Sequence, residues 1–331
     1  MTRSEPARVR FLQVEPTTRC NFTCGFCAGR HMDQTDLELD AFARALDRLP
    51  DIEHIELQGE GEPLLHPAFF AMARRARSRG IEVSTITNGS LFSPERIERV
   101  LDADLTSVLV SIESPHPTEF AAIRGGRLDK VIEGVGALLA ARNGRGLTRP
   151  AVGFAVTVLR RTEARFADIL ALYQRLGLDG GVVVQTLNGM QVYARGYSDA
   201  IRAETYAGLE RAVVERRLLR HAARAGTERR GEPTLFWSAL FARAAQPEAG
   251  CAWLRHALHI DRRGRVTTCP HVKDADRHAL GRLEEDGLEA ILSARRRIQL
   301  ALEAGDIPTA CRGCAIADAT ARAVAAREAR A

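Results

Sequence analysis

Short β-rich runs alternate with amphipathic helical segments between residues 11 and 186, and this alternation restricts the possible folds more than any other feature of the chain. The β-rich runs are 11–15, 54–58, 82–87, 107–112, 152–158 and 181–186. The helical segments between them are 37–49, 67–79, 94–103, 128–142 and 164–176. Several β-rich runs are apolar throughout, as strands are in a parallel sheet covered on both faces. Six strand–helix units in series predict an α/β fold built as a partial (β/α)6 barrel.

Polar or glycine-rich motifs follow nearly every predicted strand. The first three are C-N-F-T-C-G-F-C at 20–27, Q-G-E-G-E-P at 58–63 and T-N-G-S at 87–90. The later strands end in S-I-E-S at 111–114, T-V-L-R at 157–160 and Q-T-L-N-G at 185–189. The carboxyl ends of the strands build the active site of an α/β barrel. We therefore expect these motifs to meet in one functional site.

The seven cysteines of the chain divide into a group of three and a group of four. The first group has the spacing C-x3-C-x2-C and consists of Cys20, Cys24 and Cys27. The second group lies in the last quarter of the chain and consists of Cys251, Cys269, Cys311 and Cys314. Three thiolates can hold three irons of a [4Fe–4S] cluster and leave the fourth iron open, whereas four thiolates can close a cluster completely.

Zinc is the alternative for both groups, because thiolates at such spacings also suit a tetrahedral ion. His31 could complete a zinc site with the first group, and the second group could form a structural zinc site by itself. Three histidines near the second group, His256, His259 and His271, could replace one of its cysteines. Four thiolates make such a replacement unnecessary.

Cysteine usage and the apolar pattern also bear on the compartment. An odd number of cysteines with a tight triplet argues against a disulfide scaffold and fits a reducing compartment. The N-terminal residues lack the apolar segment of a secretory signal. No apolar run approaches the roughly 18 residues that a transmembrane helix needs. We therefore expect a cytoplasmic protein with no membrane partner.

The formal net charge of +5 would by itself suit an acidic partner such as a nucleic acid. However, only two of the 47 basic residues are lysines, Lys130 and Lys273. This bias toward arginine, together with abundant alanine, is typical of a GC-rich coding sequence. The charge is explained without a nucleic-acid partner, so we favour a small-molecule substrate.

Residues 11–160 resemble the radical S-adenosylmethionine (radical SAM) enzymes. The C-x3-C-x2-C triplet, with Phe26 just before its last cysteine and directly after the first strand, is the signature of that family. The resemblance implies a TIM-like radical SAM barrel whose first cysteine group holds a [4Fe–4S] cluster, with S-adenosylmethionine (SAM) on the open iron. It also implies reductive cleavage of SAM to a 5′-deoxyadenosyl radical, which abstracts hydrogen from a substrate carbon.

The resemblance assigns further residues to SAM. Gly59, Gly61 and Glu62 stand where the family has its GGEP motif, and Glu60 makes this loop more acidic than the family pattern. The other residues at matching positions are Asn88, Ser111, Glu113 and Arg124. Of these, Arg124 is expected to pair with the SAM carboxylate. Taken singly, each motif would be only a turn signal or a polar strand end, and their order after successive strands supports the assignment.

The region of the second cysteine group resembles the SPASM/twitch modules that follow radical SAM barrels. Segments 258–260 and 266–268 are expected to form a hairpin that turns at Gly264. No cysteine follows Cys314, so the pattern resembles the shorter twitch form, with one auxiliary [4Fe–4S] cluster. We predict a barrel domain at 1–200, a helical linker at 201–248 and an auxiliary-cluster domain at 249–331. Helices are expected at 202–224, 288–304 and 315–331.

The layout is similar to that of twitch-domain dehydrogenases of the 2-deoxy-scyllo-inosamine dehydrogenase type. The resemblance implies oxidation of a secondary alcohol of an aminocyclitol or sugar-like metabolite, with the auxiliary cluster as electron acceptor. It also implies a flavodoxin- or ferredoxin-type electron donor. A base must remove the hydroxyl proton. Arg160, at the end of the fifth strand, and Glu, His or Tyr side chains at the barrel mouth are the candidates.

Other reactions stay open. A maturase acting on a ribosomal peptide is one, although we recognise neither a leader-binding domain nor the additional cysteines of a full SPASM module. An epimerase that returns hydrogen from a thiol would need a cysteine beyond the seven that are already assigned as ligands. A radical decarboxylase of a sugar acid is a further alternative. A non-catalytic iron–sulfur protein would not need the SAM-binding motifs at the strand ends.

Overall fold

The computed structural model describes residues 8–227 and 250–329, and all its strands belong to one sheet. The sheet has the order β6-β5-β4-β3-β2-β1-β7-β8. The six predicted strands are confirmed as β1 (Phe11–Val14), β2 (His54–Leu57), β3 (Glu82–Thr87), β4 (Ser107–Ser111), β5 (Ala151–Val158) and β6 (Val182–Thr186). They pair in parallel, each with the next along the chain. The predicted α/β partial barrel is therefore confirmed.

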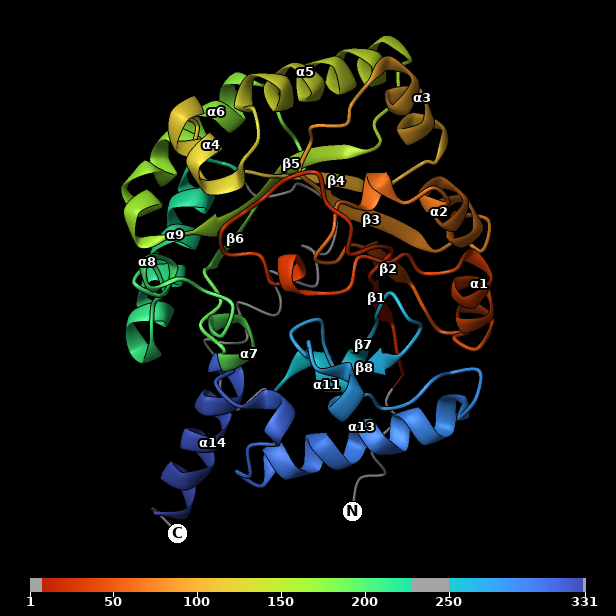
Figure 1. Ribbon diagram of the computed structural model, residues 1–331, viewed down its shortest axis with the longest axis vertical. Coiled ribbons are helices and arrows are strands. Elements are labelled where there is room, and N and C mark those ends of the chain that lie inside the picture. Colours follow the sequence, from red (N-terminus) through yellow and green to blue (C-terminus); the bar gives the residue numbers. More distant parts are fainter. Residues whose placement is uncertain (1–7, 228–249, 330–331) are drawn as a thin grey trace.

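Helices between the strands cover the outer side of the curved sheet (Figure 1). They are α1 (Leu39–Asp47), α2 (Phe69–Arg77), α3 (Pro94–Asp102), α4 (Pro117–Arg124), α5 (Leu128–Gly144) and α6 (Phe166–Arg175). Apolar strand residues such as Leu12, Ile55 and Val83 are fully buried beneath this layer. The helices start where the sequence favours it: Ser93 caps α3 by accepting a bond from the Arg96 amide.

The region after β6 departs from the predicted continuous helix at 202–224. It contains α7 (Gln191–Ala194), α8 (Asp199–Arg202) and α9 (Gly208–Arg224). The helix is interrupted between α8 and α9, and Gly208, the first residue of α9, has a φ of +51°. A continuous right-handed helix through 202–224 would not contain such a positive φ. Helix α4 was not predicted at all, because a single helix of eight residues carries little periodic signal. The remainder of the predicted linker, residues 228–248, lies outside the described residues.

The C-terminal region continues the sheet of the barrel instead of forming a separate one. Strand β7 (Ala257–Ile260) pairs in parallel with β1, and β8 (Val266–Thr267) pairs with β7 as the predicted antiparallel hairpin. Gly264 lies in its turn with a φ of +75°. The Trp253 ring packs edge-on against Phe11 of β1, with centroids 5.7 Å apart. The auxiliary region therefore shares both sheet and core with the barrel.

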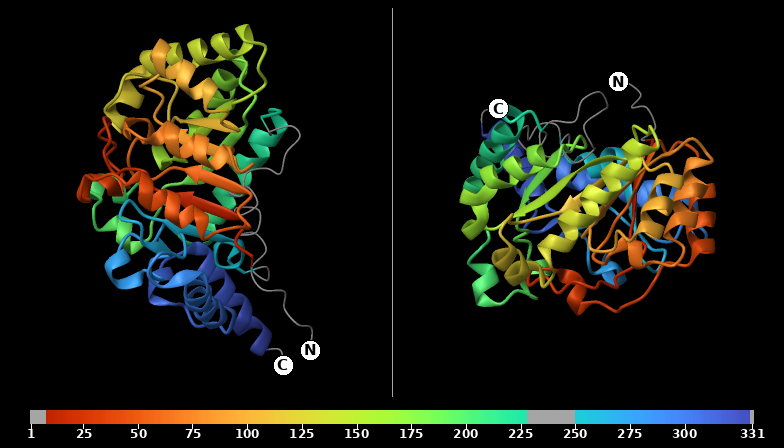
Figure 2. Two further views of the ribbon diagram at one scale, coloured as in Figure 1. Left: turned by 90° about the vertical axis from the view of Figure 1, so that its right-hand side faces the viewer. Right: turned by 90° about the horizontal axis from the view of Figure 1, so that it is seen from above.

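Helices α13 (Gly287–Glu303) and α14 (Ala315–Glu328) lie at the end of the molecule opposite α5 (Figure 1 and Figure 2). The shorter helices α11 (Ala252–His256) and α12 (Ala275–His278) belong to the same C-terminal region. Helices α13 and α14 confirm the helical segments predicted there. Within the described ranges, we find no helix with the length and apolar character needed to cross a bilayer.

Candidate functional site

A cavity of about 440 Å³ opens at the carboxyl ends of the parallel strands. Cavities of this size are typical of cofactor and small-molecule sites. Ten of the predicted site residues line it: Cys20, Cys24, Phe26, Cys27, Gly59, Gly61, Glu62, Asn88, Ser111 and Arg124. The tertiary structure thus brings the motifs of successive strand ends together, as expected for such a sheet.

The first cysteine group lies on a loop that packs against the end of α4. The Thr23 amide donates to the Arg124 carbonyl at 3.0 Å, and the Gly25 amide donates to the Ile123 carbonyl at 3.3 Å. Gly125 has a φ of +70°, and a Cβ there would lie 2.0 Å from Thr23 Oγ1. The glycine after Arg124 is therefore needed for the close approach of the cysteine loop, a role that the sequence did not reveal.

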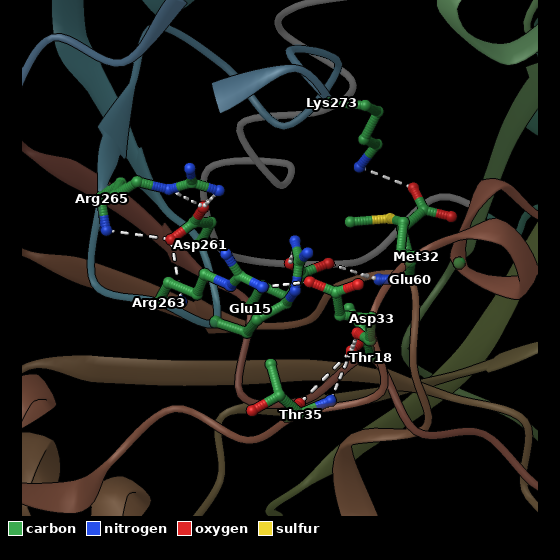
Figure 3. Close-up of polar contacts among 12 residues, drawn as sticks. Glu15, Thr18, Met32, Asp33, Thr35, Glu60, Asp261, Arg263, Arg265 and Lys273 are labelled. Carbon is green, nitrogen blue, oxygen red and sulfur yellow. Dashed lines mark hydrogen bonds and ion pairs between the residues drawn. The ribbon is translucent and has the colours of Figure 1, made fainter. Parts of the chain in front are cut away.

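Polar contacts near the beginning and end of the same loop fix its path. The Thr18 hydroxyl donates to the Asp33 carbonyl at 2.5 Å and accepts from the Thr35 amide at 3.0 Å, as Figure 3 shows. Arg19 forms two hydrogen bonds with the Asp36 carboxylate, at 2.9 and 2.6 Å. The cysteines are thus presented on a loop that is closed on itself.

Burial raises the pKa of the Cys20, Cys24 and Cys27 thiols. Because the thiolate is the metal ligand, iron loading must release protons from them. Among the described residues, no three His, Cys, Asp or Glu side chains are placed to share one metal ion. A [4Fe–4S] cluster does not require that, because each thiolate binds a different iron. His31, the candidate fourth zinc ligand, does not line the cavity.

A buried ion pair between Arg124 and Glu113 packs against the cysteine loop. Arg124 Nη2 donates to Glu113 Oε1 at 2.7 Å, a second bond joins Arg124 Nε to Glu113 Oε2, and Arg124 Nη1 lies 3.8 Å from Cys24 Sγ. Burial by itself lowers the pKa of Arg124, but the charge and hydrogen bonds of Glu113 and the nearby Cys24 and Cys20 together raise it. Glu113 itself does not line the cavity, so the structure gives it the role of holding Arg124.

Glu62 and Asn88 tie the glycine-rich loop to the end of β3. The Glu62 carboxylate accepts from the Asn88 amide at 2.7 Å, the Thr87 hydroxyl at 2.6 Å and the Leu64 amide at 3.1 Å. Burial raises the pKa of Glu62. The Asn88 side chain donates to Asn21 Oδ1 at 2.8 Å. Both residues therefore shape the cavity wall as well as lining it.

Replacing Gly61 with alanine is expected to lower the free energy of unfolding by about 1–3 kcal/mol. A Cβ at Gly61 would lie 2.4 Å from the Thr17 carbonyl oxygen, which is backbone and cannot move aside. Gly136 in α5 is the matched control, because nothing lies within 4 Å of its Cβ position. Gly136→Ala is expected to stabilise by up to about 1 kcal/mol. Urea unfolding of both iron-free variants measures the two changes in the free energy of unfolding. Equal changes would contradict the close packing of Gly61 against Thr17.

The second cysteine group surrounds a separate cavity of about 70 Å³. All four cysteines line it: Cys251, Cys269, Cys311 and Cys314. Burial raises the pKa of Cys251 to about 11 and that of Cys311 to about 12. Of the three nearby histidines only His271 lines this cavity. The structure therefore brings together the four side chains that the sequence grouped.

Asn188 and His271 form a wall between the two cavities, because both residues line each of them. Asn188 Nδ2 lies 3.1 Å from His271 Nδ1. Burial lowers the pKa of His271 to about 4, so its ring is neutral at pH 7. No sequence motif marks these two residues as the ones that separate the cysteine groups.

The cavity also contains an ion pair that the sequence did not predict. Lys273 Nζ lies 2.6 Å from Glu60 Oε1. Burial works against both charges, but their mutual attraction lowers the pKa of Glu60 and raises that of Lys273. Two features of the sequence single out these residues without pairing them. Glu60 departs from the glycine motif, and Lys273 is one of only two lysines in the chain.

The structure does not bring Arg160 to the cavity, which corrects its choice as a candidate base. Its guanidinium forms two bonds of 2.6 Å with the Glu210 carboxylate and stacks on the Tyr206 ring at 4.4 Å. The bond to Glu210 raises the pKa of Arg160, so it cannot act as a base at pH 7. Position at a strand end did not determine the direction of this long side chain.

Two family models match the chain in the regions of the two cavities. A model of the radical SAM superfamily matches residues 14–173, and the SPASM model, an iron–sulfur cluster-binding domain, matches residues 251–315. The first match contains Cys20, Cys24 and Cys27, and the second contains the four C-terminal cysteines.

Curated proteins resemble parts of the chain. It is 27% identical over 185 residues to a tungsten-containing aldehyde ferredoxin oxidoreductase cofactor-modifying protein of Pyrococcus furiosus, a match that covers 54% of this chain and 52% of that protein. It is 32% identical over 138 residues to a GTP 3′,8-cyclase of Peptoclostridium acidaminophilum, covering 39% of this chain and 42% of that protein. The chain spans about half the length of the curated relatives it matches.

Streptococcus suis SuiB, in a crystal structure with bound S-adenosylmethionine, has a similar fold. The TM-score is 0.65 and the identity 16%, over 85% of this chain and 64% of that chain. This likeness shows the fold alone. Together with the two family models and the placement of the cysteines, it leads to one conclusion. The chain carries a radical SAM domain, which binds SAM and a [4Fe–4S] cluster, followed by a SPASM domain, which binds iron–sulfur at an auxiliary site.

Proposed function

We propose that this protein is a radical SAM enzyme that oxidises a secondary alcohol of a small aminocyclitol or sugar-like metabolite to a ketone. The observation that carries the proposal is the wall of Asn188 and His271, which lines both cavities. A substrate in the larger cavity lies beside both cysteine groups. We assign Cys20, Cys24 and Cys27 to the SAM-binding cluster and the other four cysteines to one auxiliary cluster.

Oxidation of a secondary alcohol to a ketone removes one hydrogen atom, one proton and one electron from the substrate. When bound, SAM on the first cluster would supply the chemistry that removes the hydrogen atom, and an auxiliary cluster held by the other four cysteines would supply one-electron redox chemistry. Glu60 provides an ionised carboxylate in the cavity for the hydroxyl proton. It replaces Arg160 in that role. The initial electron has to come from outside, and we propose a flavodoxin- or ferredoxin-type donor.

Around SAM, the residues of this chain bind and orient. Arg124, Ser111 and Asn88 line the cavity beside the first cysteine group. Gly59 and Gly61 let the glycine-rich loop pack closely against the segment that contains Glu15 and Thr17. A Cβ at either glycine would lie less than 2.5 Å from an atom of that segment. The Glu62 side chain accepts hydrogen bonds within the cavity wall. These residues are our proposed SAM contacts, and Glu113 acts through Arg124.

The test is anaerobic turnover of reconstituted protein with SAM and a reductant, against aminocyclitols, sugars and short peptides. We expect a hydroxylated small molecule to lose two hydrogens, with one 5′-deoxyadenosine formed for each product. Mass spectrometry measures both. Loss of carbon dioxide would reveal a decarboxylase, an inverted centre with unchanged mass an epimerase, and a modified peptide a maturase. Each of these outcomes would overturn the dehydrogenase proposal.

A further inference from the structure

Four side chains in the wall of the larger cavity, Glu60, Tyr193, His271 and Lys273, form a buried polar group that we call the bridging cluster. Lys273 points toward Glu60 (Figure 3), with 2.6 Å between its ammonium and Oε1. The Tyr193 hydroxyl lies 3.4 Å from the same carboxylate oxygen and 3.4 Å from His271 Nδ1. Glu60 follows β2, whereas His271 and Lys273 follow β8. The bridging cluster therefore joins the two domains across the cavity.

Stability does not account for the pair of Lys273 and Glu60. Their side chains are only 10% and 15% exposed, so both charges have lost most of their water. Apolar residues of similar size commonly stabilise a protein as much as such a pair does. Lysine is also a specific choice here, since it offers three donors from a compact ammonium where arginine would offer a planar fork. A ligand that contacts both charges would account for the pair.

Donor capacity remains on Lys273. Glu60 takes one of its three N–H groups. An ammonium has three donors, so N–H groups are left for a ligand oxygen. The carboxylate of Glu60 can in turn accept from a ligand, because two oxygens offer more than two lone pairs. The pair thus presents a donor and an acceptor side by side, as two neighbouring hydroxyl or amino groups would require.

Two glutamines in the same cavity wall offer acceptors that no protein group uses. Gln13 Oε1 and Gln58 Oε1 are buried and have no hydrogen-bond partner within the described part of the chain. Gln13 is only 2% exposed. A buried acceptor without a partner weakens the folded state. A ligand carrying several hydroxyl groups would satisfy both.

The buried charges of the cavity disfavour an anionic ligand beside the bridging cluster. The two buried cations, Lys273 and Arg124, are each paired with a carboxylate, that of Glu60 or of Glu113. A third cation, Arg30, lines the cavity from an exposed position, where it donates to the Thr23 carbonyl. A phosphate group beside Lys273 would find no buried cation unneutralised, and it would lie close to Glu60. An uncharged or amino-bearing ligand needs no free cation and is not repelled by the Glu60 carboxylate.

We propose that the bridging cluster is the substrate-binding subsite and that it holds a compact polyhydroxylated molecule, either uncharged or bearing an amino group. Lys273 donates to one of its oxygens, Glu60 accepts from a neighbouring hydroxyl or amino group, and Gln13 and Gln58 accept from further hydroxyls. His271 also lines the second cavity, so the bound molecule lies beside the auxiliary site. This assignment rests on the proposed function for the reaction, whereas binding is tested separately.

The test is isothermal titration calorimetry on anaerobically reconstituted holoenzyme with SAM. The probes are glucosamine, myo-inositol, glucose 6-phosphate and a short serine-containing peptide. We expect glucosamine and myo-inositol to bind more tightly than the other two. Lys273→Met is expected to weaken their binding about tenfold to hundredfold, through loss of a charge-assisted hydrogen bond. Lys130→Met, at an exposed ion pair on α5, is the matched control and is expected to change nothing.

Gln13→Met distinguishes a binding role from a structural one. It removes an acceptor that has no protein partner, so the melting temperature is expected to stay or rise while polyol binding weakens. A purely structural residue would change the melting temperature without changing the affinity. Should Lys273→Met fail to assemble both clusters, Gln13→Met carries the binding test by itself.

Three results would overturn the subsite. They are equal polyol affinity in wild type and Lys273→Met, tighter binding of glucose 6-phosphate or the peptide, and no polyol binding at all. The reaction has its own readout. If polyols bind through Lys273 and none is oxidised, the subsite stands and the proposed function fails. If wild type and Lys273→Met oxidise another substrate with equal kcat/KM, the proposed function stands and the subsite fails.

Discussion

Cys20→Ala is expected to abolish SAM cleavage, whereas Cys314→Ala is expected to leave cleavage in place and to stop product formation. Cys20 lines the cavity that contains the proposed SAM contacts, and Cys314 lines the separate smaller cavity. Three thiolates are the minimum that leaves one iron open, so loss of one removes the site at which SAM binds. Loss of an auxiliary ligand interrupts only the later electron transfer.

Iron content and two products measure this prediction. The reconstituted wild type should hold about eight irons, and each variant about four. Cys20 belongs to none of the hydrophobic clusters of the described residues, so its replacement leaves the core packing intact. The two variants serve as controls for one another, since both lose one thiol. Four irons together with one zinc in the wild type would contradict the auxiliary cluster, and normal product formation by Cys314→Ala would contradict its role in oxidation.

Glu113→Ala and Arg124→Ala are each expected to lower the free energy of unfolding by about 3–5 kcal/mol. The two side chains are 0% and 9% exposed, so removal of either leaves a buried charge without its partner. The double variant Glu113→Gln/Arg124→Met should lose less than the sum of the two single changes, because it leaves no buried charge. Urea unfolding of the iron-free protein gives all the values.

The exposed pair of Arg10 and Glu53 is the control for that cycle. Its side chains are 60% and 59% exposed, and Glu53→Ala is expected to cost at most about 1 kcal/mol. If Glu113→Ala lowered the free energy of unfolding by as little as Glu53→Ala, the pair of Glu113 and Arg124 would have to be hydrated, which would contradict its burial. Because Arg124 Nη1 lies 3.8 Å from Cys24 Sγ, we also expect weaker iron loading of the first site in Arg124→Ala, measured as iron per chain.

The sequence predicted the sheet well because several of its strands are largely apolar runs, such as β5, whose residues are AVGFAVTV. Such a run has to be buried on both faces wherever it lies, so local composition decides its place. Helix α4 was not predicted, because its eight residues carry little hydrophobic periodicity. Its contribution to the site is the position of Arg124, the last residue of the helix.

The contacts of long side chains are not determined by their positions in the sequence. Arg160 stands at a strand end, yet Glu210, fifty residues away, directs its guanidinium outside the cavity. Glu60 and Lys273 are separated by more than two hundred residues, and no local pattern connects them. The pairing of β7 with β1 brings them into one wall. Contacts of this kind depend on how distant elements pack, which spacing along the chain does not encode.

The sequence by itself determined the strand–helix order, the division of the cysteines into three and four, and the strand ends at which the polar motifs lie. These follow from local composition and from the geometry that parallel strands share. Only the tertiary structure decided that the auxiliary region extends the barrel sheet, that Asn188 and His271 separate the two cysteine groups, and that Lys273 meets Glu60. The physical reason is that hydrophobic periodicity specifies which face is buried, whereas the partner of a buried charge is set by packing between elements far apart in the chain.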